Sequence, residues 1–168
     1  MPADQQLSTT LKDEVFLRLY DESLPRIIKC LEQLSETQLW WRPNESSNSI
    51  GNLVLHLCGN VTQWIGSGLG GWPDHRTRQS EFDAREGIDT KELMHLLQTT
   101  MEKIRPIILG VTADELLRKR PVQTFEETGL SILIHVTEHF SYHTGQIAYI
   151  TKMLTDSPLG FYEGIILE

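Results

Sequence analysis

The sequence predicts an all-α protein, a four-helix bundle with a long crossover loop and short extra helices. Apolar residues recur with helical spacing in four long stretches of the 168-residue chain. Residues that cap helices stand at the ends of these stretches. No segment shows a convincing alternation of apolar and polar residues, so no strand is expected. We find no repeat and no linker, and we expect a single domain over residues 1–168.

The first long stretch has apolar residues every three or four positions from residue 7 to residue 34. Pro25 lies inside it and is expected to kink the helix or to mark a weak point, because proline lacks a backbone N–H. Ser35 and Gln38 form a capping-box pattern that opens a short turn into Trp40 and Trp41. We expect this tryptophan pair to pack in the core or at an interface.

The second helix is expected to begin after Ser49, which is a good N-cap, and to end near Ile65. The segment from Gly66 to Gly87 is expected to be a loop, because four of the twelve glycines lie within its first six residues. Its glycines also spell GxGxxG. A dinucleotide site needs a strand before that motif, and here a helix precedes it.

The third helix is predicted over residues 90–109, since Asp89 and Glu92 form a capping box and Gly110 can stop the helix. A similar pattern at residues 112–115 predicts a short helix. Residues 121–128 are expected to be a connector.

The last helix is predicted over residues 129–154. An apolar stripe that includes Ile132 and Ile147 runs along it. The sequence Asp-Ser-Pro at residues 156–158 is expected to end the helix.

The charge balance argues against a nucleic-acid partner. The net charge is -8, whereas nucleic-acid binders usually carry a basic face. We interpret Arg76–Arg78, Arg85 and Arg118–Arg120 as solvated loop charges.

No apolar run is long enough to cross a membrane, and the polar N-terminus lacks a signal core, so a cytoplasmic location is expected. Cys30 and Cys58 are expected to be buried free thiols.

The histidines suggest a metal site. His135, His139 and His143 lie on the last predicted helix at steps of four residues. Each step turns the helix by about 400°, so successive histidines share one side of it. Pairs with this spacing bind zinc in other proteins. His56 lies on the second helix among apolar residues, where a buried imidazole needs a partner.

Other polar residues lie near these histidines on the predicted helices. Asn60 and Gln63 form a polar stripe with His56 along an otherwise apolar helix, which is typical of one wall of a polar pocket. Tyr142 and Gln146 project near the same face as the histidines of the last helix.

Several segments, in order along nearly the whole chain, carry a family resemblance. They are LWWRP at residues 39–43, NSIGNLVLHL at 48–57 with Gly59-Asn60, Glu81-Phe82, and HFSYHTGQI at 139–147. With these segments the chain resembles the DinB-like, or YfiT-like, superfamily of bacterial damage-inducible metalloenzymes. We can match no substrate-binding motif of that superfamily.

The resemblance implies a four-helix bundle whose metal ligands are His56, His139 and His143. It also implies frequent dimers, so a homodimer is expected. Relatives include thiol-dependent transferases and isomerases, which makes a low-molecular-weight thiol one candidate partner.

Two rival motifs are less favoured. Residues 135–139 spell HxxEH, the signature of inverted zinc peptidases, with His135 and His139 as ligands and Glu138 as the base. That site needs a further acidic ligand well downstream, and only a short tail follows. Residues 92–95 spell a single ExxH, whereas a di-iron bundle needs two copies.

Cys58 is about 200° round the helix from His56 and is therefore expected to point away from the ion.

The leading hypothesis is a metal-dependent transferase or hydrolase that acts on a small molecule. A divalent transition metal, zinc or nickel ahead of iron or manganese, would act as a Lewis acid on a bound water or a thiol. The candidates to orient water or substrate are Glu138, Asn60, Tyr142, His135 and Gln146. Glu81 follows the glycine loop and could reach the pocket mouth, or it could equally be a surface charge.

Two alternatives remain open from the sequence. One is a non-catalytic metal-binding or stress-response module with a structural ion. Three protein ligands plus an exchangeable position favour catalysis, and a fourth protein ligand favours structure. The other is a bundle whose histidines bind no metal.

Overall fold

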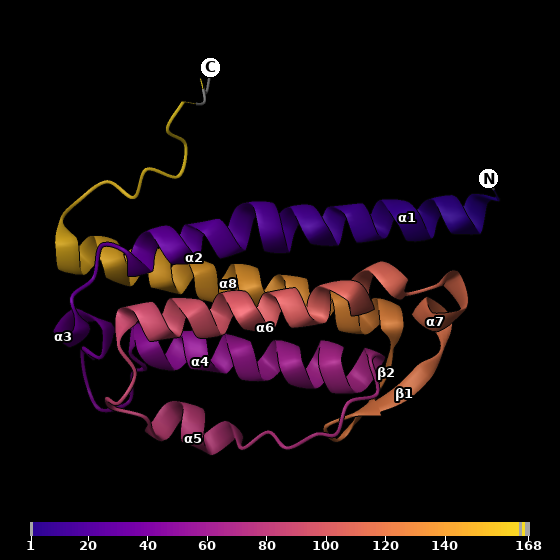
Figure 1. The fold of residues 1–168 in the computed structure, drawn as a ribbon, viewed down its shortest axis with the longest axis horizontal. Helices are drawn as coiled ribbons and strands as arrows, with labels where there is room; N and C mark the ends of the chain where they lie inside the picture. Colours follow the sequence, from indigo (N-terminus) through magenta and orange to yellow (C-terminus); the bar gives the residue numbers. More distant parts are fainter. Residues whose placement is uncertain (1, 165, 167–168) are drawn as a thin grey trace.

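A computed structural model describes residues 2–164 and 166. Four long helical stretches lie side by side as a bundle, with shorter elements at its edges (Figure 1). The predicted all-α bundle is confirmed, apart from one small hairpin. In chain order the elements are α1 (Ala3–Phe16), η1 (Leu17–Ser23), α2 (Leu24–Leu31), α3 (Glu36–Leu39), α4 (Ile50–Val61), η2 (Thr62–Leu69), α5 (Arg78–Asp83), α6 (Thr90–Gly110), α7 (Ala113–Leu117), β1 (Lys119–Val122), β2 (Phe125–Thr128) and α8 (Gly129–Thr155).

Helix caps explain where most of these helices begin. Each cap accepts a hydrogen bond from a backbone N–H that the first helical turn leaves unpaired. Reciprocal capping boxes open α3, α4 and α6, as the sequence predicts for α3 and α6. In α4 the partner of Ser49 is Asn52, a shorter side chain than the usual glutamate or glutamine. Single caps at Thr112 and Thr128 open α7 and α8.

The first long stretch is continuous but changes its winding before Pro25. The seven residues of η1 are π-helical, and Pro25 lies in the first turn of α2. Proline cannot donate to the preceding turn and its ring crowds a carbonyl there, so a widened turn relieves both problems. The weak point predicted at Pro25 is therefore a local change of winding just upstream.

The second helix is longer than predicted, because α4 continues into the π-helical η2 as far as Leu69. The loop predicted from Gly66 instead begins after η2, and α5 interrupts it. The glycines of η2 serve close packing. A side chain at Gly66 would overlap the ring of Trp72, and one at Gly68 would press on Val122.

Residues predicted as a connector form a hairpin, with β1 and β2 paired antiparallel from Lys119↔Thr128 to Val122↔Phe125. Alternate residues of β1 are buried, and one of them is Arg120. Its guanidinium pairs with the Glu115 carboxylate at 3.1 Å. Hydropathy does not reveal a buried arginine, so the alternation was hidden in the sequence.

Helix α4 is the central element, since it packs against α5, α6 and α8. Nearly all of its residues are consequently buried, including His56 and Asn60. Cys30 and Cys58 are buried free thiols, as predicted. No helix in the described part of the chain has the length and apolar character needed to cross a membrane.

Candidate metal centre

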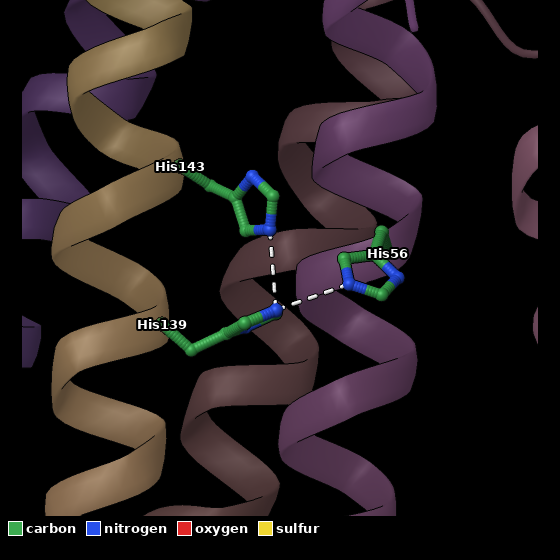
Figure 2. Close-up of side chains that lie close together, drawn as sticks. All are labelled: His56, His139 and His143. Atoms are coloured by element: carbon green, nitrogen blue, oxygen red, sulfur yellow. Dashed lines mark hydrogen bonds between the residues drawn. The ribbon is translucent and has the colours of Figure 1, made fainter.

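Three histidines from two helices converge in the bundle (Figure 2). Nε2 of His139 lies 3.0 Å from Nε2 of His56 and 3.1 Å from Nε2 of His143. One ring nitrogen from each histidine lies within 4.8 Å of the other two. His56 and His143 are buried and His139 is half-buried. The structure therefore brings together the three histidines that the family resemblance implies as ligands.

The outer nitrogens of two rings have acceptors. Nδ1 of His56 donates to Oε2 of Glu81 at 2.8 Å, and Nδ1 of His143 donates to Oε1 of Gln146 at 2.7 Å. We assign the N–H to Nδ1 because the carboxylate and the amide oxygen can only accept. A neutral imidazole has a single N–H, so Nε2 of both rings presents a lone pair to the centre of the cluster.

Burial disfavours the charged form of two of the three rings. Burial, together with the neighbouring His143 and His56, lowers the pKa of His139 to about 3. Burial also lowers the pKa of His143. Nδ1 of His139 is itself buried, without a hydrogen-bond partner among the described residues. Neutral imidazole is the form that binds metals.

The spacing of the three nitrogens fits a metal ion. Two nitrogens that share one tetrahedral zinc ion at about 2.1 Å lie roughly 3.4 Å apart. The two shortest separations in the cluster, 3.0 and 3.1 Å, are close to that value. The donor set is therefore compatible with a divalent transition metal.

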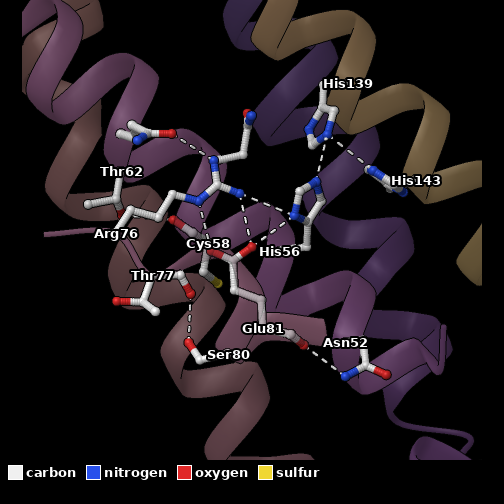
Figure 3. Close-up of polar contacts among 12 residues, drawn as sticks. Asn52, His56, Cys58, Thr62, Arg76, Thr77, Ser80, Glu81, His139 and His143 are labelled. Atoms are coloured by element: carbon white, nitrogen blue, oxygen red, sulfur yellow. Dashed lines mark hydrogen bonds and ion pairs between the residues drawn. The ribbon is translucent and has the colours of Figure 1, made fainter. Parts of the chain in front are cut away.

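A buried ion pair between Arg76 and Glu81 contacts His56 at its Nδ1 (Figure 3). The Glu81 carboxylate accepts from Nε and Nη2 of Arg76 at 2.7 and 2.9 Å, in a two-point contact. Nη2 also lies 3.1 Å from Nδ1 of His56, because both are donors to the same carboxylate oxygen. Burial acts to raise the pKa of Glu81, but the bonds from His56 and Arg76 outweigh it and hold this pKa below its ordinary value. An ionised carboxylate thus orients the ring of His56.

Helix α4 also positions the segment that carries Glu81. Nδ2 of Asn52 donates to the backbone oxygens of Glu81 and Ala84 at 2.8 and 2.9 Å, which fixes α5 against α4. Gly59 provides the room for the ion pair. A Cβ at that position would overlap the Glu81 carboxylate and lie 3.0 Å from Nε of Arg76.

Gly59→Ala is expected to weaken metal binding about tenfold, because the added methyl group pushes the Glu81 carboxylate away from His56. Alanine is the better helix former by about 1 kcal/mol, so a purely local effect would stabilise the protein. Gly145→Ala is the matched control, since a Cβ there meets nothing within 4 Å. Zinc titration of both variants measures the difference, and equal affinities would show that Glu81 does not support His56.

The other histidine of α8, His135, lies outside the cluster. Its ring stacks on Trp64 with centroids 3.8 Å apart, and its Nε2 is 3.5 Å from Nδ2 of Asn60. Oδ1 of Asn60 is buried and has no partner in the described part of the chain. Glu138 lines a groove between α1 and α8, on a different side of α8 from the cluster. The structure thus does not assemble the HxxEH site.

The remaining candidates lie beside His143. The Gln146 side chain accepts from His143 through Oε1 and donates to the Tyr142 hydroxyl through Nε2 at 3.2 Å. The Tyr142 side chain is 62% exposed. Gln146 is therefore a positioning residue for His143, and Tyr142 stands at the open side of the cluster.

The sequence does not reveal that the side chains of Arg76 and Glu81 are both buried. Arg76 was interpreted as a solvated loop charge, but its side chain is only 6% exposed. The sequence left Glu81 open between the pocket mouth and a surface charge, and the structure buries it against His56. The one sequence signal for this buried pair was Gly59, because a glycine inside a helix often marks a close approach by another segment. It lies three residues after His56.

Two pockets adjoin the cluster. One, of about 340 Å³, is lined by His56, His139, Asn60 and His135 among others. The second, of about 610 Å³, is lined by all three clustered histidines. A ligand in the second pocket can therefore reach the centre of the cluster.

Comparisons with known proteins agree with this fold. A DinB-like protein of Bacillus subtilis has a similar structure, with a TM-score of 0.67 and 22% identity over 94% of this chain and 99% of that chain. A conserved protein of Enterococcus faecalis is similar with a TM-score of 0.68 and 16% identity, over the same shares of the two chains. No curated protein matches the chain. A family model matches residues 16–160. The chain has the DinB-like fold and belongs to the family described as "Protein of unknown function (DUF1572)".

Proposed function

We propose that His56, His139 and His143 hold one divalent transition-metal ion, and that the chain uses it in a transferase or hydrolase reaction on a small molecule. The observation that carries this proposal is the convergence of three imidazole rings from two helices. Glu81 and Gln146 turn the lone pairs of two of them toward the centre. Such support of the ligands is typical of metal sites.

The surroundings of the cluster favour catalysis over a structural ion. No fourth histidine, cysteine, aspartate or glutamate of the described chain joins the group. A structural zinc site usually has four protein ligands, whereas a catalytic site leaves one position open. When bound, the ion would supply Lewis acidity to a thiol or a water in the larger pocket. Glu81 and Gln146 would hold the ligand rings, and the Tyr142 hydroxyl, which lines the larger pocket, would orient the small molecule.

Cobalt substitution tests the proposal. We expect the metal-free protein to take up one equivalent of Co²⁺, and its visible absorption to change when 2-mercaptoethanol or acetohydroxamate is added. A change means that a position on the ion is exchangeable. One bound equivalent with a spectrum that neither compound alters would support a structural ion. Failure to bind Co²⁺, Zn²⁺ or Ni²⁺ would remove the metal site altogether.

Metal removal is expected to lower the melting temperature of the protein. A ligand at a thousand times its dissociation constant stabilises the folded state by about 4 kcal/mol. For a chain of this length that corresponds to a shift of roughly 10 °C. Differential scanning calorimetry with and without a chelator measures the shift, and adding zinc back should restore it. A chelator-treated protein that melts at the original temperature would contradict the proposal.

A further inference from the structure

The larger pocket beside the cluster is a positively charged site in an acidic protein. The chain has 23 acidic and 15 basic residues. Every residue that lines this pocket lies in the described part of the chain, and none is acidic. Apart from the histidines, its one charged side chain is Arg78. A cation at the cluster would add to this positive potential.

Arg78 is held in place while its charge stays available. Its guanidinium lies over the ring of Phe82, 4.7 Å from the ring centroid. Phe82 in turn packs on His56, with ring centroids 4.7 Å apart. An aromatic face attracts a guanidinium but does not neutralise it. Among the described residues Arg78 forms no ion pair, whereas Arg76 and Arg120 are paired with carboxylates.

One acidic side chain, Glu127, lies near Arg78 without forming an ion pair with it among the described residues. Glu127 borders the smaller pocket, which Arg78 also lines. The Glu127 carboxylate accepts a hydrogen bond from the Ser131 hydroxyl and makes no ion pair with Arg78. Arg78 itself lines both of the pockets that meet at the histidines.

We propose that the larger pocket binds a small carboxylic acid, with its carboxylate on Arg78 and its reacting group at His56, His139 and His143. This inference rests on the proposed metal-dependent function. A single guanidinium matches the two oxygens and the single charge of a carboxylate, while a phosphate dianion calls for more positive charge than one arginine provides. Ser46 and Tyr149, which also line the pocket, supply hydroxyl groups for the rest of the molecule.

Hydroxamate probes of increasing length test the proposal on the zinc-loaded protein. The monohydroxamates of succinic, glutaric and adipic acid carry a metal-binding group at one end and a carboxylate at the other. Each is compared by calorimetry with the alkyl hydroxamate of equal chain length. We expect the best-fitting carboxylate probe to bind about tenfold more tightly than its alkyl counterpart.

Variants assign that preference to one residue. Arg78→Gln should bind both kinds of probe equally while its zinc content stays at one equivalent, because Arg78 is exposed and is not a ligand. Arg78→Lys should keep part of the preference. Lys91→Gln removes the same charge from an exposed position outside the pocket and should keep all of it.

The outcomes separate the two proposals. Equal binding of carboxylate and alkyl probes by the wild type would overturn the carboxylate inference and leave the metal site intact. A preference that survives in Arg78→Gln would overturn the role of Arg78. A zinc-loaded protein that binds no hydroxamate at all would overturn the proposed open metal site, and with it this inference.

Discussion

His139→Ala is expected to abolish metal binding at micromolar concentrations, since Nε2 of His139 is the atom that both other histidines approach. Structural zinc sites have apparent binding free energies of about 10–16 kcal/mol, or roughly 3 kcal/mol for each of four ligands. The loss of one ligand therefore weakens binding at least about a hundredfold. Elemental mass spectrometry should find less than about a tenth of an equivalent in the purified variant.

The same substitution should change the stability of the metal-free protein little. Nδ1 of His139 is buried without a partner among the described residues, and Nε2 contacts only the other two clustered histidines. Removal of the ring therefore leaves no buried charge and no backbone group unpaired. His135→Ala is the matched control, because His135 lies one turn earlier on α8 and outside the cluster. If His135→Ala lost the metal and His139→Ala kept it, the ligand assignment would be wrong.

Arg76→Met is expected to destabilise the fold by about 3 kcal/mol, because it leaves the buried Glu81 carboxylate without its cation. The pair is buried on both sides, with side-chain exposures of 6% and 10%. Urea unfolding of the metal-free protein measures the loss. Arg118→Met is the control, since Arg118 pairs with a carboxylate in an exposed setting and should cost less than about 1 kcal/mol.

A double variant separates stability from metal binding. Arg76→Met combined with Glu81→Met replaces the pair with apolar side chains, so we expect it to be more stable than Arg76→Met alone. Its zinc affinity should nevertheless remain about 10–100-fold below that of the wild type, because Nδ1 of His56 has lost its acceptor. If the double variant recovered both the stability and the zinc affinity of the wild type, the ion pair would contribute to stability alone.

Much of the fold could be predicted from local signals. Caps such as Ser35 and Asp89 announce helix starts in the sequence, and the structure places those helices there. The three histidines of the cluster were also predictable, because i, i+4 spacing puts His139 and His143 on one side of α8 and the family resemblance adds His56. Whether they bind a metal stays a prediction.

The remaining features depend on contacts between distant segments. Arg76 lies in a loop, and its buried pair with Glu81 occupies room that Gly59, on another helix, leaves free. The hairpin was missed because Arg120 is buried through its pair with Glu115, and a hydropathy pattern counts arginine as exposed. The extension of the second helix through η2 was missed because glycines that allow close packing look like loop glycines.

The two helices that supply the clustered histidines are far apart in the sequence, since His56 and His139 are separated by 83 residues. A shared ion would join these positions as a reversible cross-link and close the intervening chain, with α5, α6 and the hairpin, into a ring. Because the ligands meet only in the folded chain, the binding free energy of the ion would add to the stability of the fold. The loaded protein would then open slowly, because α4 cannot leave α8 until the link is released. Metal supply would thereby set the lifetime of the protein against proteolysis.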